Sequence, residues 1–208
     1  MRGPTAYAVL VLGIMFTFPA WTPDGSSAQV GQGVVDAEAL RAGDKWVYKR
    51  ASGGEYEVSV TDVVAGEYVT AVSSLPGVKF FRDRNWTVTR LEGKLERGDP
   101  RNFIGWKWLD FPMGPGKKFS YRTDSSLGTV DVDAVVGKWE KVTVPAGTFD
   151  VLRIEGCWRN RDKSWAPCGQ LRWYSPEVGT FIKQLSPRQS FGQMADFDFE
   201  LVRFTRDR

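Results

Sequence analysis

Alternation of apolar and polar residues is the dominant pattern along this chain. Tyr56, Val58 and Val60 alternate with the polar residues between them, and the stretch from Ala195 to Phe204 places apolar side chains on one side and carboxylates on the other. A period of two residues is typical of a strand with one face in the core and the other in solvent. We therefore expect most of the chain to form β-strands.

About ten to twelve such strands follow one another, with glycine and proline in the short turns between them. We expect them at residues 45–50, 56–61, 67–73, 85–91, 117–123, 130–134, 139–144, 148–155, 171–174, 180–185 and 195–204. This spacing predicts an all-β fold with very little helix: a single curved antiparallel sheet or partly open β-barrel, that is, a half-barrel. The stretch Phe103–Phe111 is ambiguous, because its helical spacing conflicts with its aromatic, strand-like composition.

The first 28 residues have the pattern of a signal peptide. Arg2 is followed by an uncharged apolar run, Ala6–Phe18, that is too short to cross a bilayer. Small residues at Ser26 and Ala28 place the cut after Ala28, and an uncleaved membrane anchor is the alternative. No later stretch is apolar enough to span a membrane. We expect a periplasmic or extracellular mature form, starting at Gln29, that does not span the membrane.

The mature chain divides into an N-terminal segment, residues 29–42, and a single β domain, residues 43–208. Asp36 could cap a short helix over Ala37–Arg41, which Gly43 would end. No linker or repeat divides the remainder. The mature length is enough for one domain to bury most of its apolar surface.

Cys157 and Cys168 are the only cysteines, and ten residues separate them. An oxidising compartment favours a disulfide, and the spacing suits a hairpin with one cysteine on each arm. Free thiols or a metal pair are the alternatives, although two thiols without histidine make a poor metal site.

Several chemistries are missing from the chain. It contains no histidine, which removes Ser-His and Cys-His catalysis and histidine-based metal sites. Walker, Ser-x-x-Lys and Cys-x-x-Cys motifs are also absent. The net charge is only +3 and no run of five like charges occurs, so nucleic acid is not an expected partner. We predict a protein that is not an enzyme and uses no cofactor or metal.

Paired carboxylates are the one catalytic group that remains. Asp131 with Asp133, and Asp196 with Asp198, share strand faces, so each pair could in principle hydrolyse a glycoside. The interpretation we favour is that they form the solvent side of amphipathic strands. Asp196, Asp198 and Glu200 also give a weak calcium pattern, which lacks the glycine and remaining ligands of a calcium loop.

Tryptophan is unusually frequent, and eight of the nine follow the signal segment. We expect four of them, which lie within strands, to fill the core: Trp46, Trp86, Trp139 and Trp173. The candidate ligand-binding residues lie in or beside the loop between the cysteines, or in the ambiguous aromatic stretch: Trp158, Trp165, Arg159, Arg161, Trp106 and Trp108. Such a disulfide-closed tip is either a binding element or a hairpin whose rings pack on the sheet.

Three motifs occur in order: Gly43–Trp46 (GDKW), Val142–Val151 (VTVPAGTFDV) and Trp173–Gly179 (WYSPEVG). Phe111–Met113 lies between the first two. Over residues 43–184 the chain resembles uncharacterised secreted bacterial proteins of the DUF3108 and TapB-like families. The resemblance implies a half-barrel sheet distantly similar to that of periplasmic lipoprotein carriers, whose concave face holds acyl chains. Those carriers lay helices across the open sheet, and this chain offers no comparable helical segment.

The two longer motifs are themselves explained by turn chemistry. Pro145-Ala146-Gly147 and Ser175–Gly179 combine the fixed φ of proline with a glycine that tolerates positive φ. We expect each to join two strands as a hairpin.

Three hypotheses about function follow. The leading one is a non-catalytic periplasmic or secreted binding protein whose concave aromatic face takes a lipid or other amphiphile. The second is a carbohydrate-binding module or carboxylate glycosidase acting on an envelope glycan. The third is a structural or protein-interaction module that uses the disulfide-closed tip. The sequence leaves the ligand and the oligomeric state open.

Overall fold

A computed structural model describes residues 33–96, 99–126, 128–161, 168–186 and 198–206. The signal segment with its expected cut after Ala28, together with Trp165 and Asp196, lies outside these ranges. No helix within them is long and apolar enough to cross a membrane.

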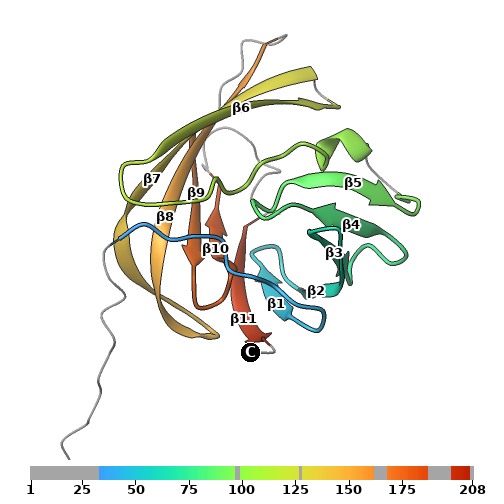
Figure 1. The fold of residues 1–208 in the computed structure, drawn as a ribbon, viewed down its shortest axis with the longest axis horizontal. Helices are drawn as coiled ribbons and strands as arrows, with labels where there is room; N and C mark the ends of the chain where they lie inside the picture. The colour runs from blue at the N-terminus through green and yellow to red at the C-terminus, as the bar shows by residue number, and fades with distance from the viewer. Residues whose placement is uncertain (1–32, 97–98, 127, 162–167, 187–197, 207–208) are drawn as a thin grey trace, which may run out of the picture.

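Eleven strands form one antiparallel sheet whose order is β5-β4-β3-β2-β1-β11-β10-β9-β8-β7-β6 (Figure 1). The two ends of this order, β5 and β6, are the sheet edges, so the sheet is curved but not closed. The predicted all-β half-barrel is thereby confirmed. The strands are β1 Lys45–Arg50, β2 Glu55–Val64, β3 Glu67–Val72, β4 Lys79–Arg82, β5 Val88–Glu92, β6 Lys118–Ser125, β7 Gly128–Val144, β8 Gly147–Asn160, β9 Cys168–Ser175, β10 Thr180–Leu185 and β11 Phe199–Thr205.

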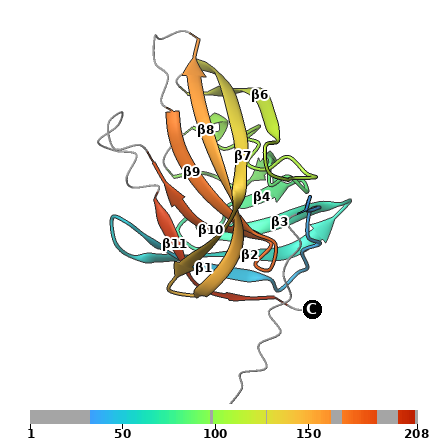
Figure 2. The same ribbon diagram turned by 90° about the vertical axis from the view of Figure 1, so that its left-hand side faces the viewer.

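The strand order explains the shape of the molecule. The chain steps outward from the central β1 to the edge strand β5, crosses to the opposite edge at β6, and steps back until β11 pairs with β1. Strands β7 and β8 are long and bend along their length, and they face the viewer in Figure 2. The curvature places the inner faces of the two halves opposite each other.

Some strand predictions were wrong in detail. The two strands expected at 130–134 and 139–144 form a single strand, β7, because a register shift between Val136 and Trp139 absorbs the glycine that suggested a break. The strand expected from residue 85 begins at Val88, because Trp86 adopts a positive φ of 59°. The short strand β4 is not among the strands predicted from the sequence.

The short helix expected over Ala37–Arg41 is not formed. The segment runs in an irregular, extended course instead. Val35 pairs with Met113 through two backbone hydrogen bonds of 2.7 and 2.8 Å, and the Tyr68 hydroxyl donates to the Glu38 carbonyl at 3.4 Å. One turn of helix is too short to be stable by itself, so these tertiary partners prevail over the capping signal.

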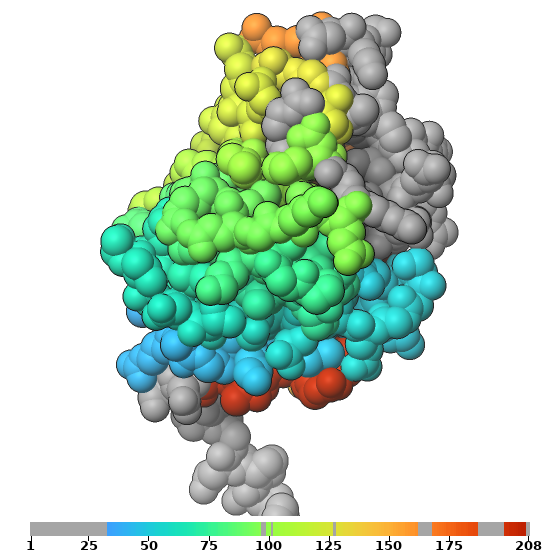
Figure 3. Space-filling model, turned by 90° about the vertical axis from the view of Figure 1, so that its right-hand side faces the viewer, coloured from blue at the N-terminus to red at the C-terminus, as the bar shows by residue number. Residues whose placement is uncertain are grey.

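Residues 99–117, here called the crossing segment, cover the concave side of the sheet without a helix, apart from the 3-10 turn Pro100–Asn102 (Figure 1). Backbone hydrogen bonds fix the segment: Gly105 N–H donates to the Val88 carbonyl at 2.8 Å, and Leu109 N–H to the Asn85 carbonyl at 3.1 Å. Its Leu109 side chain is fully buried. The ambiguous stretch 103–111 is therefore neither helix nor strand but a cover over the core. In the space-filling view, the green surface of residues 85–96 and 99–105 covers one side of the molecule (Figure 3).

Two tryptophans tie the central strand to the turn that follows β9. Trp46 and Trp86 meet edge-to-face, with ring centroids 5.6 Å apart. The indole N–H of Trp46 donates to the Val178 carbonyl at 3.0 Å, and that of Trp86 to the Gly179 carbonyl at 3.3 Å. The expected core role of both is confirmed by their burial. The turns predicted at Pro145–Gly147 and Ser175–Gly179 are both present.

Candidate functional site

A cavity of about 240 Å³ lies on the inner side of the sheet, between β1–β5 on one side, β9–β11 on the other and the crossing segment above. Its wall is mostly aromatic and aliphatic. It includes Tyr48, Tyr56, Val58, Val72, Phe103 and Phe199. Ligand sites of proteins are typically concave and apolar, with a few convergent polar groups, and their volumes are about 300–1,000 Å³. This cavity is slightly smaller than that range.

Arg172 is the first polar group in the wall. It projects inward from β9 and is 8 % exposed. Its Nε–H donates to Gln184 Oε1 at 2.8 Å, its Nη2 donates to Gln170 Oε1 at 2.9 Å, and its guanidinium carbon lies 3.4 Å from the centroid of the Trp108 ring. Burial lowers the pKa of Arg172 to about 9, against the opposing effect of the nearby Tyr121. The side chain is therefore still a cation at neutral pH.

Arg82 is the second polar group, and it comes from β4 on the other side of the cavity. Its Nε–H donates to Thr70 Oγ1 at 3.1 Å and its Nη1 to the Trp86 carbonyl at 3.3 Å. Burial lowers its pKa to about 10, still well above neutral. Burial also raises the pKa of Tyr56 to about 12 and that of Tyr48 well above its usual value, so neither phenol supplies a negative charge at neutral pH.

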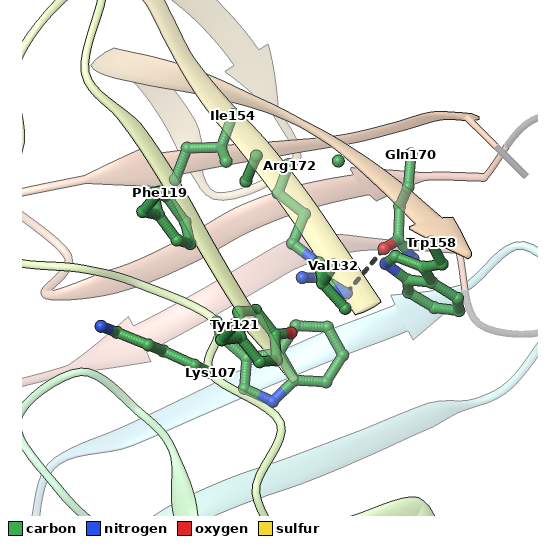
Figure 4. A pocket seen from close by; sticks show the side chains of 11 residues that line it. Lys107, Phe119, Tyr121, Val132, Ile154, Trp158, Gln170 and Arg172 are labelled. Carbon is green, nitrogen blue, oxygen red and sulfur yellow. Dashed lines mark hydrogen bonds between the residues drawn. The ribbon is translucent and has the colours of Figure 1, made fainter. Parts of the chain in front are cut away.

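A second, much smaller cavity of about 20 Å³ adjoins the first (Figure 4). The two share Arg172 and Trp108, whose stacked pair forms the partition between them. The labelled side chains of Phe119, Tyr121 and Trp158 close around it. It has room for about one water molecule, so it is a packing defect beside the larger cavity and not a separate ligand site.

The predicted site residues separate into two groups in the structure. Trp106, Trp108 and Trp158 lie together on the inner side, with Trp106 5.0 Å from Trp158 and 6.3 Å from Trp108 between ring centroids. Among them, only Trp108 lines the larger cavity. Arg159 is exposed on the opposite face of β8, because strand alternation places it one residue out of phase with Trp158, and Arg161 is exposed in the turn just after the strand. The sixth candidate, Trp165, lies outside the described residues.

Arg159 and Arg161 are engaged in ion pairs on the outer face. Arg159 pairs with Asp133, and Arg161 pairs with Asp131 at 2.6 Å. Asp131 also pairs with Arg122 at 2.8 Å. Hydrogen bonds from Arg122 and Arg161 lower the pKa of Asp131. An acidic group with a lowered pKa is a poor general acid, and the ladder of alternating charges agrees with the solvent-face interpretation of these carboxylates.

The disulfide between Cys157 and Cys168 is confirmed. The two residues face each other across β8 and β9, at the place where the register of this pair shifts. They close the base of the tip, whose residues 162–167 lie outside the described ranges. The second acidic pair cannot be placed either, because Asp196 is outside them, while Asp198 Oδ1 accepts the Ser186 N–H at 2.6 Å.

Neither arginine of the cavity is among the residues predicted from the sequence. The sequence does carry a signal for Arg172, because it shares strand parity with Tyr174 and so falls on the inner, apolar face of its strand. No comparable signal exists for Arg82, because β4 was not recognised as a strand.

Comparison with known proteins gives no family assignment. No family model matches the chain, and no curated protein matches it. The resemblance to the DUF3108 and TapB-like families therefore stays a prediction.

Three solved structures are similar in part. A lipoprotein candidate from Parabacteroides distasonis is 14 % identical, with a TM-score of 0.40, over 83 % of this chain and 100 % of its own. A candidate exported protein with a YmcC-like fold from Bacteroides fragilis is 12 % identical, with a TM-score of 0.41, over 83 % and 100 % of the two chains. The hypothetical lipoprotein YmcC from Escherichia coli is 10 % identical, with a TM-score of 0.42, over 82 % and 90 %. Likeness at this level does not define a function.

Proposed function

We propose that this chain is an exported, non-catalytic binding protein whose inner cavity takes a lipophilic ligand. The observation that carries the proposal is the cavity of about 240 Å³, walled by aromatic and aliphatic side chains from strands of both halves of the sheet. Water against the apolar part of this wall finds few hydrogen-bond partners, so the apolar part of a ligand gains free energy by displacing it, at about 25 cal/mol per Å² of apolar surface buried.

Two features support export. The signal-peptide pattern of residues 1–28 is one. The disulfide between Cys157 and Cys168 is the other, because such bonds persist in oxidising compartments and are rare in the cytosol.

The glycan alternative has less support. Binding of a sugar ring needs an open, flat tryptophan face, but Trp106 is 8 % exposed and its ring is packed against two neighbouring tryptophans. Trp46 and Trp86 are buried as well.

A cavity-filling substitution tests the proposal. Val72 lines the cavity from the last residue of β3, and Val72→Trp would place an indole in the ligand space. We expect wild-type protein to bind the neutral apolar dye N-phenyl-1-naphthylamine, with its phenyl ring inside the cavity and its larger naphthyl group at the opening, and with a rise in dye fluorescence. We expect Val72→Trp to weaken this binding about tenfold or more, because the loss of buried apolar contact exceeds about 1.4 kcal/mol.

The matched control is Val63→Trp, which adds the same indole at a position that is 41 % exposed. Thermal unfolding of both variants checks that they are folded. Dye binding that is equal in Val72→Trp and Val63→Trp, or absent from the wild type, would contradict the proposal.

A further inference from the structure

Two arginines face the same apolar cavity, and no carboxylate of the described residues pairs with them. Among the described residues, no Asp or Glu forms an ion pair with Arg82 or Arg172, and the groups that interact with their charges are tyrosines. A buried cation is normally paired, because its removal from water is expensive unless an opposite charge or a full set of hydrogen bonds replaces the lost hydration. The cavity thus has positive charge to offer a ligand.

Each guanidinium also keeps donors that the described protein groups do not use. Arg172 donates from Nε and Nη2, and no described acceptor takes the two N–H groups of its Nη1. Arg82 donates from Nε and Nη1, and no described acceptor takes those of its Nη2. The neutral acceptors that each arginine does have, such as Gln170 and Gln184 for Arg172, orient the guanidinium but leave its charge intact.

The stacking of Arg172 on Trp108 fixes the direction of these donors. At 3.4 Å from the ring centroid, the guanidinium lies over the indole face, which leaves its edges free to form hydrogen bonds. Figure 4 shows the side chain extended from β9 with one hydrogen bond, to Gln170. A planar fork held in this way matches the two oxygens of a carboxylate or phosphate.

We propose that the ligand is an amphiphile with an anionic oxygen head group, a carboxylate or a phosphate, bound by Arg172 and Arg82 while its tail lies among the aromatic side chains of the cavity. This inference rests on the binding role proposed above and adds the sign and chemistry of the head group. The cavity of about 240 Å³ holds about eight heavy atoms at ~30 Å³ each, so a short tail is enclosed and a longer one extends through the opening.

A series of ligands with one tail and different heads tests the inference. Octanoate, octyl phosphate, octan-1-ol and octylammonium are each titrated into the full mature protein at pH 7.5 by isothermal titration calorimetry. We expect octanoate or octyl phosphate to bind about ten- to a hundredfold more tightly than octan-1-ol, as charge-assisted hydrogen bonds allow. Octylammonium should bind most weakly. Whichever of the two anions has the higher affinity shows whether the site prefers a carboxylate or a phosphate head group.

Variants of the arginines locate the effect. Arg172→Gln and Arg82→Gln should each weaken the binding of the better anion about tenfold or more, and change that of octan-1-ol by less than about twofold. Arg122→Gln is the matched control, because Arg122 lies on the outer face in an ion pair with Asp131 and should leave all four affinities unchanged. If Arg172→Gln does not fold, the affinities of Arg82→Gln and of the wild-type protein for the four ligands still test the inference.

The outcomes separate the two proposals. Octan-1-ol binding as tightly as both anions, or octylammonium binding best, would overturn the anionic head group and leave the lipophilic cavity standing. Anion binding that survives both arginine substitutions would overturn it as well. Binding of none of the four ligands, together with no binding of the neutral dye, would overturn the binding role and this inference with it.

Discussion

Trp46→Ala is expected to lower the free energy of unfolding by about 3–5 kcal/mol, the range for removing a large aromatic side chain from a core. Trp46 is fully buried in the central strand β1, between β2 and β11. The substitution removes its edge-to-face contact with Trp86 and leaves the buried Val178 carbonyl without the indole donor. Urea unfolding followed by circular dichroism measures the loss as a fall in midpoint at constant slope.

Trp139→Ala provides the comparison, because Trp139 is half-buried on β7 and its indole N–H donates to the Gly33 carbonyl at 3.3 Å near the N-terminal end of the described chain. We expect Trp139→Ala to lower the free energy of unfolding by less than about 2 kcal/mol, because folding buries less apolar surface at this position than at Trp46. Equal losses for Trp46→Ala and Trp139→Ala would show that the centre of the sheet is not the main source of stability.

Reduction of the disulfide is expected to lower the free energy of unfolding by about 2–4 kcal/mol, because the bond closes a loop with a sequence separation of 11 and so restricts the unfolded chain. Native protein should contain no free thiols before reduction. The measurement is urea unfolding with and without a reductant, alongside a thiol titration in denaturant. The double variant Cys157→Ser with Cys168→Ser controls for other effects of the reductant, and its own stability should not change when reductant is added.

Unfolding midpoints that do not differ between oxidised and reduced protein would contradict this expectation. They would mean that the ends of β8 and β9 are held together by strand pairing alone. Neither Cys157 nor Cys168 lines the cavity, so breaking the bond between them should leave the cavity intact. We therefore expect reduced protein, while folded, to bind the neutral dye as the oxidised form does.

The alternation of apolar and polar residues was enough to predict the half-barrel, because one buried face imposes a period of two on almost every strand. Alternation also places Trp158 on the inner side and Arg159 on the outer face, so the prediction that Trp158, Arg159 and Arg161 form one site is wrong. The features that could not be predicted from the sequence depend on contacts between residues far apart in the chain. The crossing segment covers the concave side through backbone hydrogen bonds to residues such as Asn85 and Val88, and such bonds leave no local pattern.

The cavity belongs to the same class of long-range features. Arg82 and Arg172 are 90 positions apart in the chain and come from strands on different halves of the sheet. Both line the same cavity only because the sheet is curved. A buried arginine without an acidic partner also cannot be recognised before its neighbours are known. The lone charged residue on the inner parity of β9 was the one local indication of it.

The most direct test of the central claim is native mass spectrometry of the protein purified from its own compartment, followed by organic extraction. We predict a bound species that adds mass to the polypeptide, is removed by the solvent, ionises in negative mode as an acidic amphiphile, and is absent from Val72→Trp prepared in the same way. Protein that carries only its polypeptide mass, and gains none when octanoate or octyl phosphate is added, would contradict the account.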